Sequence, residues 1–422
     1  MGWSALTAAT IPLGLTGATP ALAGGPPGRE GVTESTQESY QRAFQETVAN
    51  DKAVRRHIVP GREFLYRPRQ LLVAPQDLGR VTARLRALGH QVTEGRGFAG
   101  VGRLVFAQET DVPSVVARLR DPRQWPEQPV PKVQPHHVLV GFGNIMGNPG
   151  APPRVAPALP APDPARLGEG AGVTVGVCDT GIWGQAAVAH PQWLGGSYLP
   201  ETDDVDPLYA GSGHLALQGG HGTFVAGVIR QAAPGVGLDP EAALDPNGLG
   251  DEESLTAAIG RLSPQVTVVN LSLGYFTQDD QPPLPMVNVL AGLRPGVAVV
   301  AAAGNGGTAR PSWPAASPRV LAVAAVAPGP TPADYSGFGS WVDACTAGDR
   351  TSTYVDGELW LPGEPALVFR RFASWAGTSF ATAHVAGRLA ALMTAAGLDA
   401  EAARAALLAA PRWHPDYGVL IG

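Results

Sequence analysis

The sequence predicts an α/β protein with a mostly parallel central sheet, preceded by a smaller α+β unit. Four short runs rich in β-branched residues lack polar alternation, which is typical of strands buried on both faces of a parallel sheet. Stretches with helical periodicity separate these runs, and this alternation favours helices on both faces of the sheet. The runs are residues 173–177, 266–270, 297–302 and 320–326. The predicted helices are residues 221–231, 253–262, 286–293, 379–394 and 399–409.

Length and composition allow one large domain or two to three ordinary ones. The chain has 422 residues, of which 44% are apolar, with 54 Gly and 41 Pro. The two cysteines exclude a disulfide-rich scaffold and a Cys-rich metal cluster. Because no apolar run approaches the roughly 20 residues that span a bilayer, we expect no stable membrane span.

Charge is distributed unevenly along the chain. Residues 1–150 carry 17 Lys and Arg against 12 Asp and Glu, a net charge of +5. Residues 151–422 carry 13 against 24, a net charge of −11. The basic residues are dispersed, with no Lys/Arg block and no interleaved aromatics, so we favour two complementary domains and expect no nucleic-acid binding.

Residues 1–23 have features of a signal peptide. A mildly apolar stretch ends in Ala21-Leu22-Ala23, a pattern that suits signal peptidase, although residues 1–5 contain no Lys or Arg. We interpret the segment as a signal peptide and expect secretion. The alternative is a disordered tail on a cytoplasmic protein.

Two units precede the parallel-sheet region. Residues 31–59 are polar with a weak helical period formed by Tyr40, Phe44 and Val48, which predicts a surface helix of unknown role. Residues 66–140 predict the order β-α-β-β-α-β, a ferredoxin-like unit of about 70 residues. Its predicted elements are a strand at 70–74, a helix at 78–88, strands at 91–94 and 103–107, a helix capped by Asp111 and a strand at 132–140.

A proline-rich linker follows at residues 141–164. Seven prolines lie between positions 149 and 164, a density that neither a helix nor a sheet interior tolerates. This linker is the clearest domain boundary in the sequence, and it makes residues 165–422 the second domain.

Polar residues stand where the predicted strands end and the helices begin. Asp179 and Asn305 follow two of the apolar runs, and His221 and Ser379 open two of the helices. Active sites of open parallel sheets lie at the carboxyl ends of the strands. Serine is a weak nucleophile until a base such as histidine takes its proton, and a carboxylate fixes the tautomer of that histidine. Because a side-chain amide can bind an oxyanion, these four residues predict acyl-transfer chemistry.

Four segments resemble the motifs of the subtilisin-like serine proteases. They are residues 175–182 (VGVCDTGI), 221–227 (HGTFVAG), 301–305 (AAAGN) and 377–387 (GTSFATAHVAG). Their order, Asp before His before Ser, is that of subtilisin. The resemblance covers residues 165–422 and implies a subtilisin-like three-layer fold. It also implies a serine endopeptidase in which Ser379 is the nucleophile, His221 the general base and acid, Asp179 the residue that orients His221, and Asn305 part of the oxyanion hole.

By the same resemblance, residues 270–274 form the edge strand that pairs with the substrate backbone, and residues 301–304 form the opposite wall of the P1 pocket. Pairing of this kind supplies affinity that does not depend on the substrate sequence. The residues expected to bind substrate are Leu271, Ser272, Leu273, Gly274, Ala302, Ala303 and Gly304.

Many members of the family carry a ferredoxin-like propeptide that chaperones folding and inhibits the enzyme. Residues 66–140 resemble it in element order, so the resemblance implies a zymogen whose partners are protein or peptide substrates and its own propeptide. A basic inhibitor docked on an acidic domain fits the charge distribution. We expect a monomer, and self-cleavage within residues 140–148, which contain no proline.

Three departures from the family pattern concern Ala383, Phe224 and the segment after Val228. Ala383 replaces a proline, which costs pre-organisation but no chemistry. Phe224 replaces a residue that is often His and is not catalytic. The calcium-binding loop that follows Val228 in many relatives is missing, so we expect no metal at that position and no cofactor.

Several residues have alternative interpretations. We expect Cys178 and Cys345 to be buried free thiols rather than a disulfide, and His136-His137 to be a solvated strand end rather than a metal site. Residues 251–253 either shape a substrate pocket or are acids that favour a helix N-terminus, and we favour the latter. A dedicated maturation protease or peptide ligase, and a catalytically silent binding module, are the alternatives to a general endopeptidase.

Overall fold

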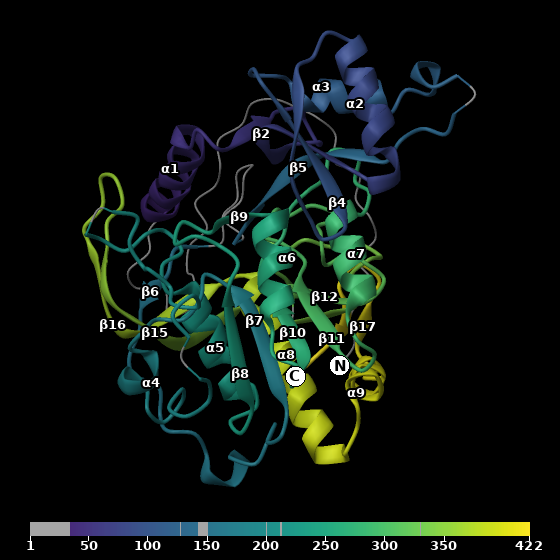
Figure 1. The fold of residues 1–422 in the computed structure, drawn as a ribbon. Coiled ribbons are helices and arrows are strands. Elements are labelled where there is room, and N and C mark those ends of the chain that lie inside the picture. The colour runs from purple at the N-terminus through teal and green to yellow at the C-terminus, as the bar shows by residue number, and fades with distance from the viewer. Residues whose placement is uncertain (1–33, 127, 142–150, 200, 212, 330) are drawn as a thin grey trace, which may run out of the picture. The chain divides into compact units, whose positions relative to one another are not determined.

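The computed structural model describes residues 34–126, 128–141, 151–199, 201–211, 213–329 and 331–422 of the chain (Figure 1). The predicted signal peptide, residues 1–23, lies outside these ranges, as does most of the stretch predicted for self-cleavage. Of the helices that the structure describes, none is long and apolar enough to cross a membrane.

The N-terminal part begins with a helix and continues as an antiparallel sheet. Its elements are α1 (Glu34–Asn50), β1 (Arg55–His57), β2 (Phe64–Val73), α2 (Leu78–Ala87), β3 (Val92–Phe98), β4 (Val101–Phe106), α3 (Val112–Leu119) and β5 (Val133–Val140). The strands β2 to β5 pair in the order β3-β4-β2-β5, and each pair is antiparallel. Leu71, Leu85, Leu104 and Val116 are fully buried between this sheet and its two helices. The elements therefore follow in the predicted β-α-β-β-α-β order.

The second sheet is the parallel sheet expected from the four apolar runs. Its strands are β7 (Thr174–Asp179), β8 (Gly237–Ala242), β10 (Val266–Leu271), β11 (Ala298–Ala302), β12 (Val320–Ala327), β13 (Thr331–Pro332), β14 (Ala344–Ala347), β17 (Trp413–His414) and β18 (Gly418–Leu420). From β8 the order is β8-β7-β10-β11-β12-β14-β18-β17, and β13 pairs with β12. Pairs along this order are parallel except β17–β18, and β13 is also antiparallel.

Helices cover both faces of this sheet, as Figure 1 shows. They are α5 (His221–Ala232), α8 (Thr378–Ala396) and α9 (Ala400–Leu408) on one face, and α6 (Glu252–Arg261) and α7 (Leu284–Gly292) on the other. Neighbouring residues of β10 separate accordingly, since Val268 packs with the α5–α8 cluster and Val269 with the α6–α7 cluster. Burial on both faces explains why these strands lack polar alternation. The predicted three-layer α/β fold is confirmed.

A hairpin and several short elements are not anticipated by the sequence pattern. The hairpin consists of β15 (Asp349–Leu359) and β16 (Leu367–Ala376), and β6 (Arg154–Val155) pairs with β16 at its edge. The short elements are β9 (Leu249–Asp251), α4 (Ala186–Ala189) and the 3-10 turns η1 (Pro75–Asp77), η2 (Pro122–Gln124) and η3 (Pro164–Arg166). Because β6 lies within residues 141–164, part of the predicted linker joins a sheet as an edge strand.

Candidate active site

Asp179 and His221 form a buried pair at the carboxyl end of β7. Asp179 is the last residue of this strand and His221 the first residue of α5. The Nδ1 of His221 lies 2.7 Å from Oδ1 of Asp179, and neither residue is more than 2% exposed. The N–H of Thr180 also donates to Oδ1 of Asp179, at 2.7 Å. A carboxylate held in this way fixes the imidazole so that Nε2 faces the opposite direction.

A second buried acid, Asp206, connects the two segments that carry this pair. Its Oδ2 accepts hydrogen bonds from Thr180 Oγ1 at 2.7 Å and from the Gly220 N–H at 2.8 Å. Burial raises the pKa of Asp206 to about 6, against the lowering effect of these hydrogen bonds and of one from the Leu208 N–H. Asp206 is not predicted from the sequence, because it lies in a loop with no periodic pattern.

Ser379 is the second residue of α8, and its side chain is held close to β10. Its Oγ donates to the backbone oxygen of Ser272 at 3.2 Å, and the Ser272 hydroxyl donates to the backbone oxygen of Ser379 at 2.9 Å. At this position in the first helical turn, the Ser379 N–H has no helical acceptor and is available to an anion. Ser379, His221 and Asn305 line one small cavity.

The amide of Asn305 is fixed by the residue before Ser379. Its Oδ1 accepts from both the N–H and the hydroxyl of Thr378, each at 2.9 Å. This leaves Nδ2 directed toward the start of α8, where a Cβ at Gly377 would lie 3.2 Å from it. Asn305 Nδ2 and the Ser379 N–H therefore both lie at the start of α8.

Aromatic rings surround His221. The ring centroids of Trp375 and Phe380 each lie 5.3 Å from that of His221, and Phe224 packs on Phe380 at 4.4 Å. Phe224 is fully buried. A site with such walls excludes water and strengthens its electrostatic interactions.

The end of β5 lies between two backbone edges beside Ser379. On one side Val140 and Gly274 exchange two hydrogen bonds, of 3.1 and 3.2 Å. On the other side β9 pairs antiparallel with Val138, Leu139 and Val140, and the Gly141 N–H donates to the Gly248 oxygen at 2.7 Å. Gly274 thus pairs with β5 on one side, and β9 forms a second pairing edge that no sequence pattern predicts.

The other expected substrate-binding residues lie next to this edge. Leu271 and Ala301 are register partners in the adjacent parallel strands β10 and β11. Ala302, Ala303 and Gly304 follow at the end of β11, next to Asn305. The side chains of Leu271 and Leu273 are fully buried in the same hydrophobic cluster as Leu139 of β5.

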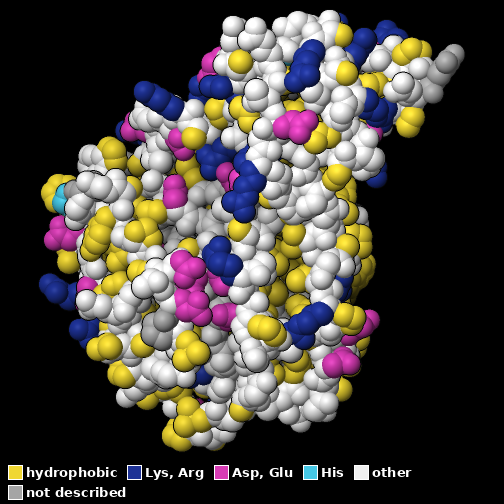
Figure 2. All heavy atoms as spheres, in the orientation of Figure 1, with side chains coloured by type: hydrophobic (Ala, Val, Ile, Leu, Met, Phe, Trp, Pro, Cys, Tyr) yellow, Lys and Arg dark blue, Asp and Glu magenta, His cyan; other side chains and the backbone are white. Residues whose placement is uncertain are grey.

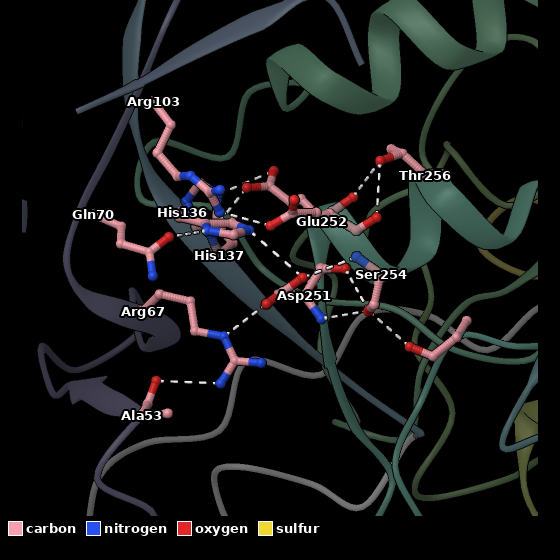
Figure 3. A network of polar contacts seen from close by, with 12 residues as sticks. Ala53, Arg67, Gln70, Arg103, His136, His137, Asp251, Glu252, Ser254 and Thr256 are labelled. Carbon is pink, nitrogen blue, oxygen red and sulfur yellow. Dashed lines mark hydrogen bonds and ion pairs between the residues drawn. The ribbon is translucent and has the colours of Figure 1, made fainter. Parts of the chain in front are cut away.

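The expectation that His136 and His137 form a solvated strand end is wrong. Both are only 1% exposed and face the N-terminus of α6 (Figure 3). The His137 N–H donates to Glu252 Oε2 at 2.9 Å, and His136 Nε2 lies 3.7 Å from Asp251 Oδ1. The strand end is buried because β5 docks on the second domain here instead of ending in solvent.

The acids at the start of α6 do more than favour its dipole. As expected, Asp251 caps the helix through the Ser254 N–H, in a capping box. Asp251 also pairs with Arg67 at 2.7 Å, and Glu253 with Arg103 at 2.6 Å. Burial raises the pKa of Asp251, but the nearby His136 and Arg67 and the hydrogen bond from the Ser254 N–H together lower it well below its usual range.

A third such pair joins Arg120 to Asp279 at 2.7 Å. In all three pairs the arginine belongs to the N-terminal part and the acid to the second domain. On the face drawn in Figure 2, Lys and Arg are frequent over the N-terminal sheet, and a patch of Asp and Glu lies over the second domain. The uneven charge noted in the sequence therefore corresponds to contacts between the two parts.

Two further observations concern cysteines and metal ligands. Cys178 and Cys345 are buried free thiols, as predicted. Glu201, Asp203 and Asp204 bring three carboxylate oxygens within 4.8 Å of one another, but two of the three residues are exposed. Among the described residues this is the one group of that kind, and an acidic cluster alone does not define a metal site. The predicted absence of metal stays a prediction.

This fold and the arrangement around Ser379 define a class of protein. Residues 170–411 match the model of the Subtilase family, Peptidase_S8. This match covers more than half of the chain, so the chain belongs to the subtilase family.

Individual relatives agree with this assignment. Thermitase of Thermoactinomyces vulgaris is 31% identical over 261 residues, which are 59% of this chain and 84% of thermitase. The minor extracellular protease Epr of Bacillus subtilis is 37% identical over 185 residues, 41% of this chain but only 26% of Epr. The crystal structure of fervidolysin from Fervidobacterium pennivorans, a keratinolytic enzyme related to subtilisin, shares the fold with a TM-score of 0.55 at 20% identity. That match covers 86% of this chain and 61% of fervidolysin.

Proposed function

We propose that the protein is a serine endopeptidase made as a zymogen, with Asp179, His221 and Ser379 as its catalytic residues. The observation that carries the proposal is the buried pair of Asp179 and His221, 2.7 Å apart, which shares one cavity with Ser379 and Asn305. Family membership supports the same activity. A peptide strand, β5, already lies in the cleft beside these residues.

The reaction begins when Ser379 Oγ attacks the carbonyl carbon of the scissile bond and His221 Nε2 takes the hydroxyl proton. Asn305 Nδ2 and the Ser379 N–H stabilise the oxyanion that forms. His221 then gives its proton to the departing amine, which leaves an ester on Ser379. A water molecule, deprotonated by His221, attacks that ester and releases the acid product. Asp179 stays ionised throughout and stabilises the imidazolium.

The same proposal makes residues 66–140 an inhibitory propeptide. Support comes from β5, which pairs with both edges of the cleft as an extended substrate would. Leu139 is fully buried in the cluster that contains Leu273, so the strand also fills a side-chain pocket. Residues 165–422 are accordingly the catalytic domain, and residues 141–164 connect the two.

The pairing register supports one bond as the site of self-cleavage. Val140 is opposite Gly274 in an antiparallel pair, and Ser272 precedes Gly274 by two residues, so the pairing position that Ser272 offers is two residues beyond Val140. The Ser272 backbone oxygen lies 3.2 Å from Ser379 Oγ. We therefore propose that Ser379 cuts the bond between Phe142 and Gly143, within the predicted stretch 140–148. Phe142 itself lies outside the described residues.

We further propose that the protein is secreted, in keeping with its similarity to the minor extracellular protease Epr. N-terminal sequencing of the purified products tests both processing events together. A product whose first residue lies shortly after Ala23 supports the signal peptide. A second product whose first residue is Gly143 supports self-cleavage. A chain that starts at Met1 and stays whole contradicts both.

A further inference from the structure

The helix α1 is the surface helix predicted within residues 31–59, and one of its faces is buried against the rest of the protein. Its buried residues Thr36, Tyr40, Phe44 and Val48 recur every four positions and form one continuous stripe. Glu38, Arg42 and Glu46 lie on the opposite, exposed face with the same spacing. Such a pattern defines an amphipathic helix whose apolar face is covered. Tyr40, Phe44 and Val48 belong to the same hydrophobic cluster as Leu217 and Tyr354 of the catalytic domain.

Tyr40 is the anchor of this contact. Its side chain is 2% exposed, and its hydroxyl donates to the Leu217 oxygen at 2.8 Å and accepts from Gln218 Nε2 at 2.7 Å. Burial raises the pKa of Tyr40 well above its usual value, so the hydroxyl stays protonated as a donor. An aromatic side chain buried with its polar end satisfied is typical of the residues that dominate binding energy.

The contact lies directly beside the catalytic centre. The oxygen of Gln218 accepts a hydrogen bond from the His221 N–H at 2.9 Å, so Tyr40 binds the turn that precedes the catalytic histidine. Tyr40 also lines the same cavity as Gly141, His221 and Ser379. The strand β5 runs toward Ser379 and ends at Val140. Beyond this end of the strand, α1 borders the active site.

We propose that the catalytic domain carries a helix-binding surface beside its active site, with the turn Leu217-Gln218 at its centre and α1 as its occupant. This inference rests on the proposed function. The N-terminal fragment is thereby held at two places, through β5 in the cleft and through α1 on this surface. Two linked contacts raise the effective affinity above that of either alone. The surface fits an amphipathic helix with Tyr, Phe and Val at four-residue intervals.

The consequence is a slow release of the fragment after self-cleavage. Tyr40→Ala removes the anchor, and we expect the cut fragment to leave at least tenfold faster than from the wild type. Glu46→Ala is the matched control, since it makes the same replacement on the exposed face of the same helix. The measurement is the rate at which peptidase activity, or labelling of Ser379 by a fluorophosphonate, appears once the chain is fully cut.

A second design keeps Tyr40 in place and separates α1 by proteolysis. The 422-residue chain contains only two lysines, Lys52 and Lys132, and both are exposed. In a Lys132→Arg variant, endoproteinase Lys-C therefore cuts only after Lys52, between α1 and β1. We expect this cut to accelerate release of the remaining fragment by the same factor as Tyr40→Ala. In the cut protein, Tyr40→Ala should have no further effect.

The outcomes separate this inference from the proposed function. Equal release rates for wild type, Tyr40→Ala and the Lys52-cut protein, with full activity in each at the end, overturn the helix-binding surface alone. Absence of activity and of Ser379 labelling in every sample, even after the fragment has left, overturns the proposed function. Faster release in the Lys52-cut protein supports the inference even if the Tyr40→Ala variant fails to fold.

Discussion

Individual hydrogen bonds hold His221 in place from two directions. Asp179 binds its ring, and Asp206 binds the backbone of Gly220 immediately before it. Because Asp206 also binds Thr180, next to Asp179, it sets the distance between the strand and the helix that carry the pair. Asp206 is therefore a positioning residue, and its contribution reaches the reaction only through Asp179 and His221.

Replacing Asp206 should lower turnover without removing the nucleophile. We expect Asp206→Ala to reduce kcat on the order of tenfold or more, because buried donors at Thr180 and Gly220 lose their acceptor. Fluorophosphonate titration should still label Ser379 in the folded variant. Asp203→Ala, at a largely exposed carboxylate in the same loop, is the control and should match the wild type.

Buried acids also predict how stability depends on pH. Burial raises the pKa of Glu241 to about 7 and that of Asp206 to about 6. A raised pKa means that the folded state holds a proton that the unfolded state releases. The stability of the fold is therefore greatest at pH values below the pKa values of these acids in the unfolded state, and it falls as pH rises through 6 to 7. The melting temperature of a Ser379→Ala variant should be higher at pH 5.5 than at pH 8. Glu241→Gln should reduce this difference, and an unchanged dependence would contradict the assignment.

Elements that carry the site pack with unusually close backbones. A Cβ at Gly387 in α8 would lie 2.6 Å from the Ile229 oxygen and from the Ala232 Cβ in α5. Since α5 begins with His221 and α8 carries Ser379, this contact sets the spacing of base and nucleophile. Glycine is therefore required at position 387 by the approach of two helices.

Gly387→Ala should push α5 and α8 apart. We expect a loss of about 1–3 kcal/mol in the free energy of unfolding, as is typical of overpacking, together with a lower kcat. Gly260→Ala lies inside helix α6 with open space around its Cβ, so it should be neutral or slightly stabilising. Thermal melts and kinetics of both variants test this, and equal behaviour of the two would refute the packing argument.

Predictability from sequence differs between elements for physical reasons. The strands β10, β11 and β12 are continuous apolar runs, so periodicity alone finds them. By contrast, β8 contains Asp239, Pro240 and Glu241, and β9 has only three residues. The strand β9 pairs with β5, which is far away in the sequence, so no local sequence pattern predicts β9. Asp179, His221, Asn305 and Ser379 were found through motifs, whereas Asp206 and Tyr40 act through contacts distant in sequence.

Across the whole molecule, opposite charges join the N-terminal part to the catalytic domain. Arg67, Arg103 and Arg120 each reach an acid of that domain, within 2.6–2.7 Å. All three pairs are partly exposed, so salt screens them. The opposite net charges of the two halves of the sequence predict a charged contact between the two parts. They do not predict which residues form it.

Raised salt should therefore speed release of the cut fragment. The Debye length falls from about 10 Å at 0.1 M to about 3 Å at 1 M salt, which weakens attraction between the two parts. The Arg67→Ala variant should release its cut fragment faster than the wild type at low salt. Its release rate should also depend less on the salt concentration. Arg123→Ala is the control, because its partner Asp121 belongs to the same part and its side chain is 88% exposed. Release rates that do not change with salt concentration would contradict a charged interface.

The central claim is that Ser379 is the nucleophile that cuts this chain and its substrates. Intact-mass measurement of the wild type and of Ser379→Ala, each expressed without other proteases, tests this most directly. We expect two fragments that meet at the bond after Phe142 in the wild type, and an uncut chain in Ser379→Ala. A Ser379→Ala chain cut at the same bond, or a wild-type chain that stays whole yet hydrolyses protein substrates, would contradict it.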